Sequence, residues 1–132
     1  KRNTIFNGNI VYNVLLGKEW KLTKKLRLNA NTKVVYAGGL RFIPIDLEES
    51  IANNDEVFDY SKAYESKQPY YARGDFSLGL KLELKSVSQE WKLEIKNITN
   101  RKNVFDTNYS SGEIVTQYQT GLFPVFLYRI YF

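Results

Sequence analysis

The feature that most constrains the fold of this chain is a strict two-residue alternation of apolar and polar side chains. It is clearest over residues 72–84. On one parity lie Phe76, Leu78, Leu80, Leu82 and Leu84, and on the other lie Asp75, Ser77, Gly79, Lys81, Glu83 and Lys85. Successive side chains of a β-strand point to opposite faces of its sheet. The pattern therefore predicts a strand with one apolar face and one polar face.

Four further segments repeat the same period. They span residues 4–22, 26–39, 91–96 and 114–132. Short polar turns at 23–25 and 86–89 join the first segment to the second and the third to the fourth, which predicts antiparallel hairpins. The fold class that we expect is all-β, an antiparallel meander of five amphipathic strands.

The connections alternate between short and long. Two irregular segments, about 40–70 and 97–113, are rich in Gly, Pro, Asn and acidic residues, and a helical turn is expected near Ile51. A meander with short turns at one end and long loops at the other is typical of transmembrane β-barrels. Five strands cannot close a barrel and would leave two long edges exposed. The chain also begins at Lys1 rather than Met, so we expect residues 1–132 to be a single partial domain, the C-terminal segment of a larger barrel.

Composition narrows the function. The chain has no Cys, Met or His, which excludes thiol nucleophiles, disulfides, zinc fingers and histidine-based catalysis within it. Its net charge is +5, but seven of its fourteen acidic residues lie between Asp46 and Glu65, and its basic residues are spread singly. A nucleic-acid surface would concentrate them in one patch. We expect no enzyme activity, no cofactor, no metal site and no nucleic-acid partner.

The apolar faces could meet either a protein core or a lipid bilayer. A soluble antiparallel barrel or sandwich with its apolar face inward is the general alternative. The polar faces carry charges of both signs, which suits a hydrated lumen and an outer surface equally; the lumen-facing candidates are Arg27, Lys33, Lys81, Glu83, Glu94, Lys96 and Arg129. The positions of the aromatic residues favour lipid. Large aromatic residues lie near strand ends, and Trp20, Trp91 and Phe132 are expected to share one level as a periplasmic aromatic belt.

Several stretches, taken in order, carry a family resemblance. They are Leu16-Gly17-Lys18-Glu19-Trp20, Tyr36-Ala37-Gly38-Gly39-Leu40-Arg41-Phe42, Pro44-Ile45-Asp46-Leu47-Glu48, Ile95-Lys96-Asn97-Ile98-Thr99-Asn100-Arg101-Lys102-Asn103-Val104-Phe105, Leu122-Phe123-Pro124 and Tyr128-Arg129-Ile130-Tyr131-Phe132. Together they cover essentially the whole chain. With these residues the chain resembles the C-terminal β-barrel end of TonB-dependent outer-membrane receptors, especially those of the Bacteroidetes type.

The resemblance implies a barrel of about 22 strands in the bacterial outer membrane, closed by an N-terminal plug domain. Such receptors import scarce nutrients (iron chelates, cobalamin, glycans or peptides) without covalent chemistry. The implied partners are outer-membrane lipid, the rest of the barrel and its plug, the TonB system and a surface lipoprotein. The terminal strand would carry the barrel-assembly signal through Phe126, Tyr128, Ile130 and Phe132. Two alternatives stay open: a receptor-like barrel serving as a scaffold in a larger outer-membrane assembly, and a soluble carrier of apolar ligands.

Four local motifs have simpler interpretations. Arg73-Gly74-Asp75 spells an adhesion tripeptide, but the alternation predicts a strand entry with Asp75 on the polar face. Asn97-Ile98-Thr99 and Asn108-Tyr109-Ser110 match the glycosylation pattern and are interpreted as turn residues. The acidic segment Asp46–Glu65 lacks the spacing of a calcium loop. We interpret it as a solvated extracellular lid, with ion binding or sugar binding through Tyr60, Tyr64, Tyr70 and Tyr71 as the alternatives.

Overall fold

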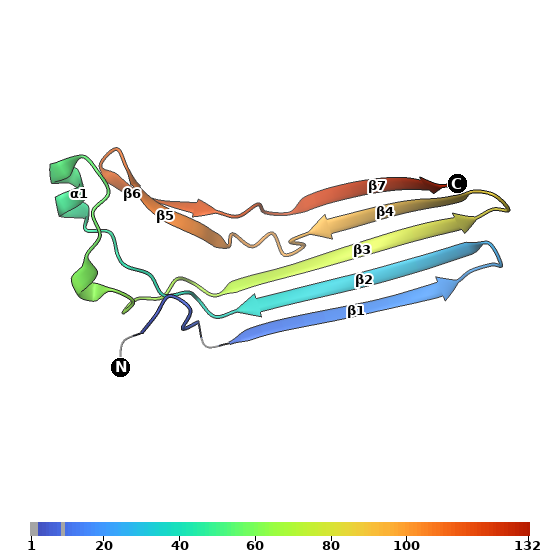
Figure 1. The fold of residues 1–132 in the computed structure, drawn as a ribbon, viewed down its shortest axis with the longest axis horizontal. Coiled ribbons are helices and arrows are strands. Elements are labelled where there is room, and N and C mark those ends of the chain that lie inside the picture. Colours follow the sequence, from blue (N-terminus) through green and yellow to red (C-terminus); the bar gives the residue numbers. More distant parts are fainter. Residues whose placement is uncertain (1–2, 9) are drawn as a thin grey trace. The chain divides into compact units, whose positions relative to one another are not determined.

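The computed structural model describes residues 3–8 and 10–132, which form two compact units (Figure 1). The unit that we call the sheet unit comprises Tyr12–Val35, Arg73–Arg101 and Thr120–Phe132. The unit that we call the loop unit comprises Lys1–Val11, Tyr36–Ala72 and Lys102–Gln119. The chain is mainly β, with 55% of its residues in strands and 8% in helices, so the expected dominance of β-structure is confirmed.

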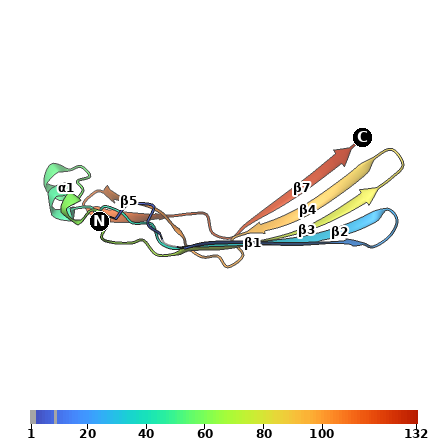
Figure 2. The same ribbon diagram turned by 60° about the horizontal axis from the view of Figure 1, so that its bottom comes forward.

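The main sheet is a single antiparallel layer of five strands, as the alternation predicts. In chain order they are β1 (Val11–Lys21), β2 (Leu26–Ala37), β3 (Tyr71–Glu83), β4 (Ser88–Lys96) and β7 (Phe123–Tyr131). Their order across the sheet is β1-β2-β3-β4-β7, so β1 and β7 lie at its two edges. Figure 2 shows β2, β3, β4 and β7 fanning apart along their length, as expected for a twisted sheet.

The register of the strands separates the two faces. Across β3, β4 and β7, Leu78 pairs with Leu93 and Leu93 with Phe126, which forms an apolar row. One residue earlier in β3, Ser77 pairs with Glu94 in a row of the opposite face. The two-residue alternation therefore places apolar and polar side chains on opposite sides of the sheet.

The last segment differs from the expected single strand over residues 114–132. Residues 113–118 instead form β6 (Glu113–Tyr118), which pairs with β5 (Val104–Ser110) in a separate two-stranded sheet. The loop expected at 97–113 thus contains a strand. The two strands are joined by Ser111 and Gly112, with φ angles of 51° and 89°. Two consecutive positive φ angles define the two-residue turn that fits the twist of a hairpin.

The irregular segment between β2 and β3 is ordered around a short helix. Helix α1 (Leu47–Asn53) contains the expected turn near Ile51, and the one-turn helix η1 spans Tyr60–Lys62. Asp46 caps α1 by accepting a hydrogen bond from the Glu49 backbone N–H (3.1 Å). The chain before α1 runs antiparallel to the chain after it, through the bridges Arg41–Lys67 and Ile45–Phe58.

Two glycines of the loop unit lie where backbones nearly touch. A Cβ on Gly38 would be 1.9 Å from the Gly8 carbonyl oxygen, and a Cβ on Gly39 would be 1.7 Å from that of Gln68. Neither contact can accommodate a side chain without moving backbone. These close approaches give a physical reason for the Gly38-Gly39 pair.

Burial in the described residues is the reverse of that in a globular domain. No apolar side chain of the described chain is buried, and the buried residues that carry side chains are all polar: Ser50, Asp75, Ser77, Asn97 and Asn103. Soluble domains bury Leu, Ile, Val and Phe and leave most Asp and Asn residues exposed. The sheet unit by itself therefore has no apolar core.

Candidate functional site

The apolar face of the main sheet is the largest feature of the sheet unit that needs explanation. Leu78, Leu93 and Phe126 form one row and are 42%, 45% and 67% exposed. In the next row, the Trp91 ring lies 5.5 Å from the Tyr128 ring at an angle of 30°. Soluble monomers seldom expose a contiguous apolar patch of this kind without a use for it.

The polar face holds two groups of ion pairs, one across β1, β2 and β3 and one across β4 and β7. Arg27 on β2 bridges Glu19 on β1 (3.4 Å) and Glu83 on β3 (3.2 Å). Lys81 also pairs with Glu83 (3.2 Å). On the same face, towards the β7 edge of the sheet, Arg129 on β7 pairs with Glu90 on β4 (3.7 Å).

A second cluster of charges lies towards the opposite end of the same face. Glu94 pairs with Lys96 and with Lys92, the latter at 3.8 Å, and Lys96 lies 3.8 Å from Asp75. These residues line a hollow of about 290 Å³ together with Lys33. The register and these contacts place all seven polar candidates on one face, although nothing in the contacts identifies that face as a lumen.

Two residues of the candidate aromatic belt, Trp91 and Phe132, lie at different positions along the paired strands β4 and β7. The register places Trp91 opposite Tyr128, four residues before Phe132. At roughly 3.3 Å per residue, this separates Trp91 from Phe132 by about 13 Å along the strand direction. Trp20 lies one residue before the end of β1. An offset along a tilted strand does not fix the depth of a residue in a membrane, so the shared level of Trp20, Trp91 and Phe132 stays a prediction.

The four candidate residues of the assembly signal belong to β7 and the residue after it. Phe126, Tyr128 and Ile130 share the apolar face, where they pair with Leu93, Trp91 and Gln89. Phe132 follows the last residue of β7 and is fully exposed. Their common parity on an edge strand agrees with the sequence pattern.

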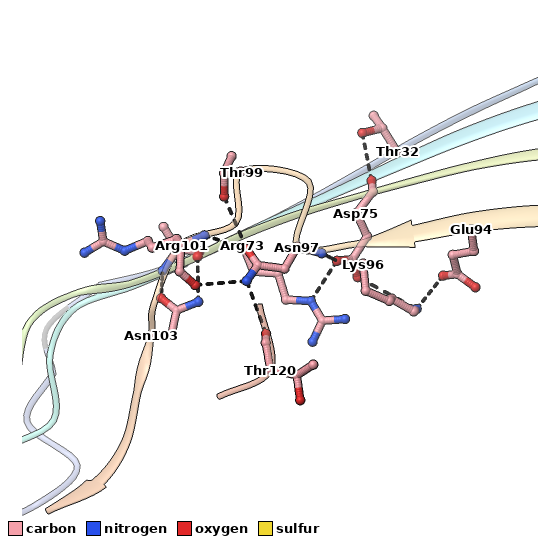
Figure 3. Close-up of polar contacts among 11 residues, drawn as sticks. Thr32, Arg73, Asp75, Glu94, Lys96, Asn97, Thr99, Arg101, Asn103 and Thr120 are labelled. Atoms are coloured by element: carbon pink, nitrogen blue, oxygen red, sulfur yellow. Dashed lines mark hydrogen bonds and ion pairs between the residues drawn. The ribbon is translucent and has the colours of Figure 1, made fainter. Parts of the chain in front are cut away.

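The ends of β3 and β4 are joined by a buried polar cluster centred on Asp75 and Asn97 (Figure 3). These side chains are 8% and 3% exposed. Asp75 Oδ1 accepts hydrogen bonds from the Asn97 backbone N–H (2.9 Å) and from Arg73 Nε (2.7 Å). On the neighbouring strand, Thr32 Oγ1 donates to the Asp75 carbonyl oxygen (3.1 Å).

Asn97 also fastens the segment that follows β4. Its φ is 50°, a left-handed conformation that Asn tolerates better than most residues. Its Nδ2 donates to the carbonyl oxygens of Arg101 (2.9 Å) and Thr120 (3.3 Å), and its Oδ1 accepts from the Arg101 N–H (3.2 Å). Because Thr120 precedes β7, Asn97 connects the end of β4 to the residues that lead into β7.

The structure shows where three of the motifs noted in the sequence lie. Arg73-Gly74-Asp75 does lie at the start of a strand with Asp75 on the polar face, and Asp75 is buried rather than presented for adhesion. Asn97 is a turn residue, and its buried side chain is fully engaged in hydrogen bonds. Asn108 is different: it lies within β5, so its interpretation as a turn residue is wrong.

The acidic segment does not gather its carboxylates. Among the described residues no three acidic side chains lie close enough together to hold a metal ion. Its tyrosines do not form one platform either. Tyr70 packs against Tyr36 at 5.3 Å and Tyr60 against Phe58 at 6.3 Å, while Tyr64 lines a cavity.

No helix in the described part of the chain is long and apolar enough to span a bilayer.

Comparison of the chain with known protein families, curated proteins and solved structures finds no match.

Sequence reasoning missed two buried residues that organise the loop unit. Ser50, in α1, accepts the Val57 N–H (3.0 Å) through its Oγ and is fully buried. Asn103 donates to the Ala72 carbonyl oxygen (2.9 Å) and accepts the Ala72 N–H (3.0 Å). A single Ser or Asn in a polar segment gives no periodic signal, so neither residue was distinguishable from its neighbours.

Proposed function

We propose that the sheet unit is a transmembrane portion of a large outer-membrane β-barrel belonging to a TonB-dependent receptor. In this proposal the apolar face contacts lipid and the polar face lines a hydrated lumen. The observation that carries it is the inverted burial of β3, in which Asp75, Ser77 and Gly79 are buried while Phe76 and Leu78 are exposed. A bilayer supplies an apolar environment for the exposed face, and ion pairs suit the wet one.

Strand length supports the same proposal. The five strands of the main sheet contain between 9 and 13 residues. A strand that crosses a bilayer at a tilt needs about 9–11 residues, whereas the mean strand of a globular protein has about 5–6. By contrast, β5 and β6 contain 7 and 6 residues. The long strands are therefore those with the exposed apolar face.

The open edges of β1 and β7 also support a larger barrel. Long unpaired edges invite aggregation, and closure into a barrel removes them. Additional strands pairing with β1 and β7 would satisfy both edges. The role in nutrient import rests on the sequence resemblance, and it requires a plug and contact with TonB elsewhere in the receptor.

The orientation of the two faces can be measured directly because the chain contains no Cys. Spin labels would be placed at Leu80→Cys on the apolar face and Lys81→Cys on the polar face, in outer-membrane vesicles. We expect the label at 80 to collide with oxygen, which dissolves in lipid, and the label at 81 with a water-soluble nickel complex. Equal exposure of both labels to nickel would reject a lipid-facing surface.

Transport and scaffold roles make different predictions in cells. If the protein imports a nutrient, its deletion should slow growth when that nutrient is limiting, and loss of TonB should reproduce the defect. If it is a scaffold, deletion should dissociate an outer-membrane assembly without a growth defect that depends on TonB.

A further inference from the structure

We propose that the loop unit binds a small organic cation with an aromatic or apolar body. The site is a cavity of about 630 Å³ beside the segments that flank α1. Sites for small molecules commonly enclose about 300–1,000 Å³ and combine apolar walls with a few polar groups. The proposal concerns the loop unit alone and does not rest on the membrane role of the sheet unit.

Three segments of the loop unit contribute the apolar wall of this cavity. Phe42 and Pro44 come from the chain before α1, Phe58 and Tyr64 from the chain after it, and Ile114 from β6. Phe42 and Tyr64 are half-buried, so they offer ring surface while remaining accessible. This wall favours a ligand with a flat or apolar portion.

The charged groups of the cavity have one sign. Among the described residues that line it, only Glu56 and Asp106 carry charge. The segment from Asp46 to Glu65 contains seven acidic residues and one basic residue, Lys62. The Lys62 ammonium pairs with Asp59 at 2.8 Å. The nearby Arg41 guanidinium does not line the cavity and donates to the carbonyl oxygens of Tyr64 and Glu65. A cation in the cavity would therefore meet carboxylates and aromatic side chains, both of which attract it.

Glu56 is held in position by the hairpin. Its Oε2 accepts a hydrogen bond from the Tyr109 backbone N–H (2.8 Å). A carboxylate has about four acceptor positions, so this bond leaves capacity for an ammonium donor. Because the bond fixes the carboxylate on the wall of the cavity, little side-chain freedom remains to be lost when a ligand binds.

Tyr64 is held on the cavity wall by its backbone contacts. Its φ is 62°, a left-handed conformation that is unfavourable for a bulky residue. Its N–H donates to the Phe42 carbonyl oxygen (3.1 Å), and its own carbonyl oxygen accepts from Arg41 Nη1 (2.8 Å). These bonds hold the backbone in that conformation and leave the side chain on the cavity wall.

A neighbouring cavity of the loop unit shows that the charge is specific to this site. It measures about 730 Å³, and its lining includes Phe6, Leu40 and Phe105. None of the described residues that line it is charged. Apolar volume is therefore available elsewhere in the loop unit, whereas apolar walls combined with carboxylates occur at the Glu56 cavity.

The test uses the purified full chain in neutral-detergent micelles and three probes of matched shape. These are 2-phenylethylammonium, phenylacetate and 2-phenylethanol, followed by NMR titration and calorimetry. We expect saturable binding of the ammonium at least about tenfold tighter than that of the neutral or anionic probe. Equal binding of the three probes, or no saturable binding of the ammonium, would overturn the proposal without any variant.

Variants then locate the site. Glu56→Gln keeps an acceptor for the Tyr109 N–H but removes the charge, so binding should weaken about tenfold with the fold intact. The matched control is Glu48→Gln, an exposed carboxylate in the first turn of α1 that does not line the cavity. An equal effect of both variants would indicate general electrostatics and would reject this cavity as the site.

A change at Tyr64 separates binding from structure. Tyr64→Gly relieves the left-handed strain and removes the ring, so the chain should unfold at a higher temperature while the ammonium binds more weakly. A ring that served only to stabilise the loop would give a lower unfolding temperature. Unchanged binding in this variant would exclude Tyr64 from the site.

Discussion

The sheet unit and the loop unit are organised by different parts of the chain. In the sheet unit, regular strands align apolar side chains on one face and ion pairs on the other, and Asp75 and Asn97 join the strand ends. In the loop unit, close backbone approaches at Gly38 and Gly39 and capped turns hold an irregular path. The comparison shows that exposed apolar residues occur in two different settings in one chain: on one face of a regular sheet in the first unit, and in irregular segments and a short hairpin in the second.

The largest expected effect comes from comparing two exposed apolar side chains, one from each unit. Leu78 in β3 and Ile51 in α1 are 42% and 53% exposed. If the sheet faces lipid, Leu78→Arg should destabilise the protein in vesicles by about 2–4 kcal/mol, because a charge near the bilayer midplane is costly. Ile51→Arg should change stability by less than about 0.5 kcal/mol. Denaturant unfolding in vesicles measures both, and similar values would remove the distinction between the units.

For glycine substitutions, we expect the larger loss of stability in the loop unit and the smaller one in the sheet unit. Gly39→Ala in the loop unit should cost about 1–3 kcal/mol, because its Cβ would overlap the Gln68 carbonyl oxygen and force backbone to move. Gly74→Ala in β3 is the control, since its Cβ would meet only Ile98 Cγ2 at 3.4 Å. Thermal unfolding should show a lower midpoint for the first variant and little change for the second. The reverse order would mean that the close approach at Gly39 is not required.

The polar cluster of the sheet unit predicts a comparable loss. Asn97→Ala removes the hydrogen bonds to Arg101 and Thr120 and should destabilise the chain by about 1–3 kcal/mol. Asn108→Ala in β5 removes a 3.4 Å bond from Gln117 at an exposed position and should cost less than about 0.5 kcal/mol. Urea unfolding of the two variants measures the difference. Equal values would show that Asn97 is not a central connection.

The smallest expected effect lies in the loop unit and depends on pH. A hydrogen bond from Lys62, and a second from Ser61, lower the pKa of Asp59 from 3.8 to about 2. Because the pKa is lowered in the folded state, the contribution of Asp59 to stability is present above about pH 4 and is lost as the pH falls towards 2.

NMR titration of the Asp59 carboxyl carbon measures this pKa. In Lys62→Ala it should rise towards its ordinary value, while the pKa values of carboxyl groups in the sheet unit stay as they are. An Asp59 pKa unaffected by this substitution would rule out the Lys62 contact as its cause.

The main sheet could be predicted because its information lies in neighbouring residues. Phe76, Leu78 and Leu80 alternate with Ser77 and Gly79, and the period alone fixes both the strand and its two faces. The hairpin β5–β6 escaped prediction because Asp106, Thr107 and Asn108 give a polar composition that resembles a loop. Its best signal was Ser111-Gly112, a pair suited to a two-residue turn between alternating residues.

The candidate sites depend on contacts between distant residues and were predictable only in part. Asp46 and Glu49 have the spacing of a helix cap, so the start of α1 could have been located. The contact of Asp75 with Asn97 spans 22 positions, and that of Glu56 with Tyr109 spans 53. No period or local motif encodes such separations. The left-handed Tyr64 is likewise set by its partners, Phe42 and Arg41, rather than by its own propensity.

The way in which the chain leaves and re-enters the main sheet has a consequence for its evolution. Strand β7 pairs with β4 over nine residues, although the β5–β6 hairpin lies between them in sequence. Asn97 donates a hydrogen bond to the Thr120 carbonyl oxygen, and Asn100 Oδ1 accepts one from the Leu122 N–H (2.9 Å). These bonds join the residues that follow β4 to the residues that lead into β7. The β5–β6 hairpin can therefore lengthen, shorten or be replaced while the contacts of Asn97 and Asn100 keep β7 in the same register. Changes in the β5–β6 hairpin are in this way separated from changes in the main sheet.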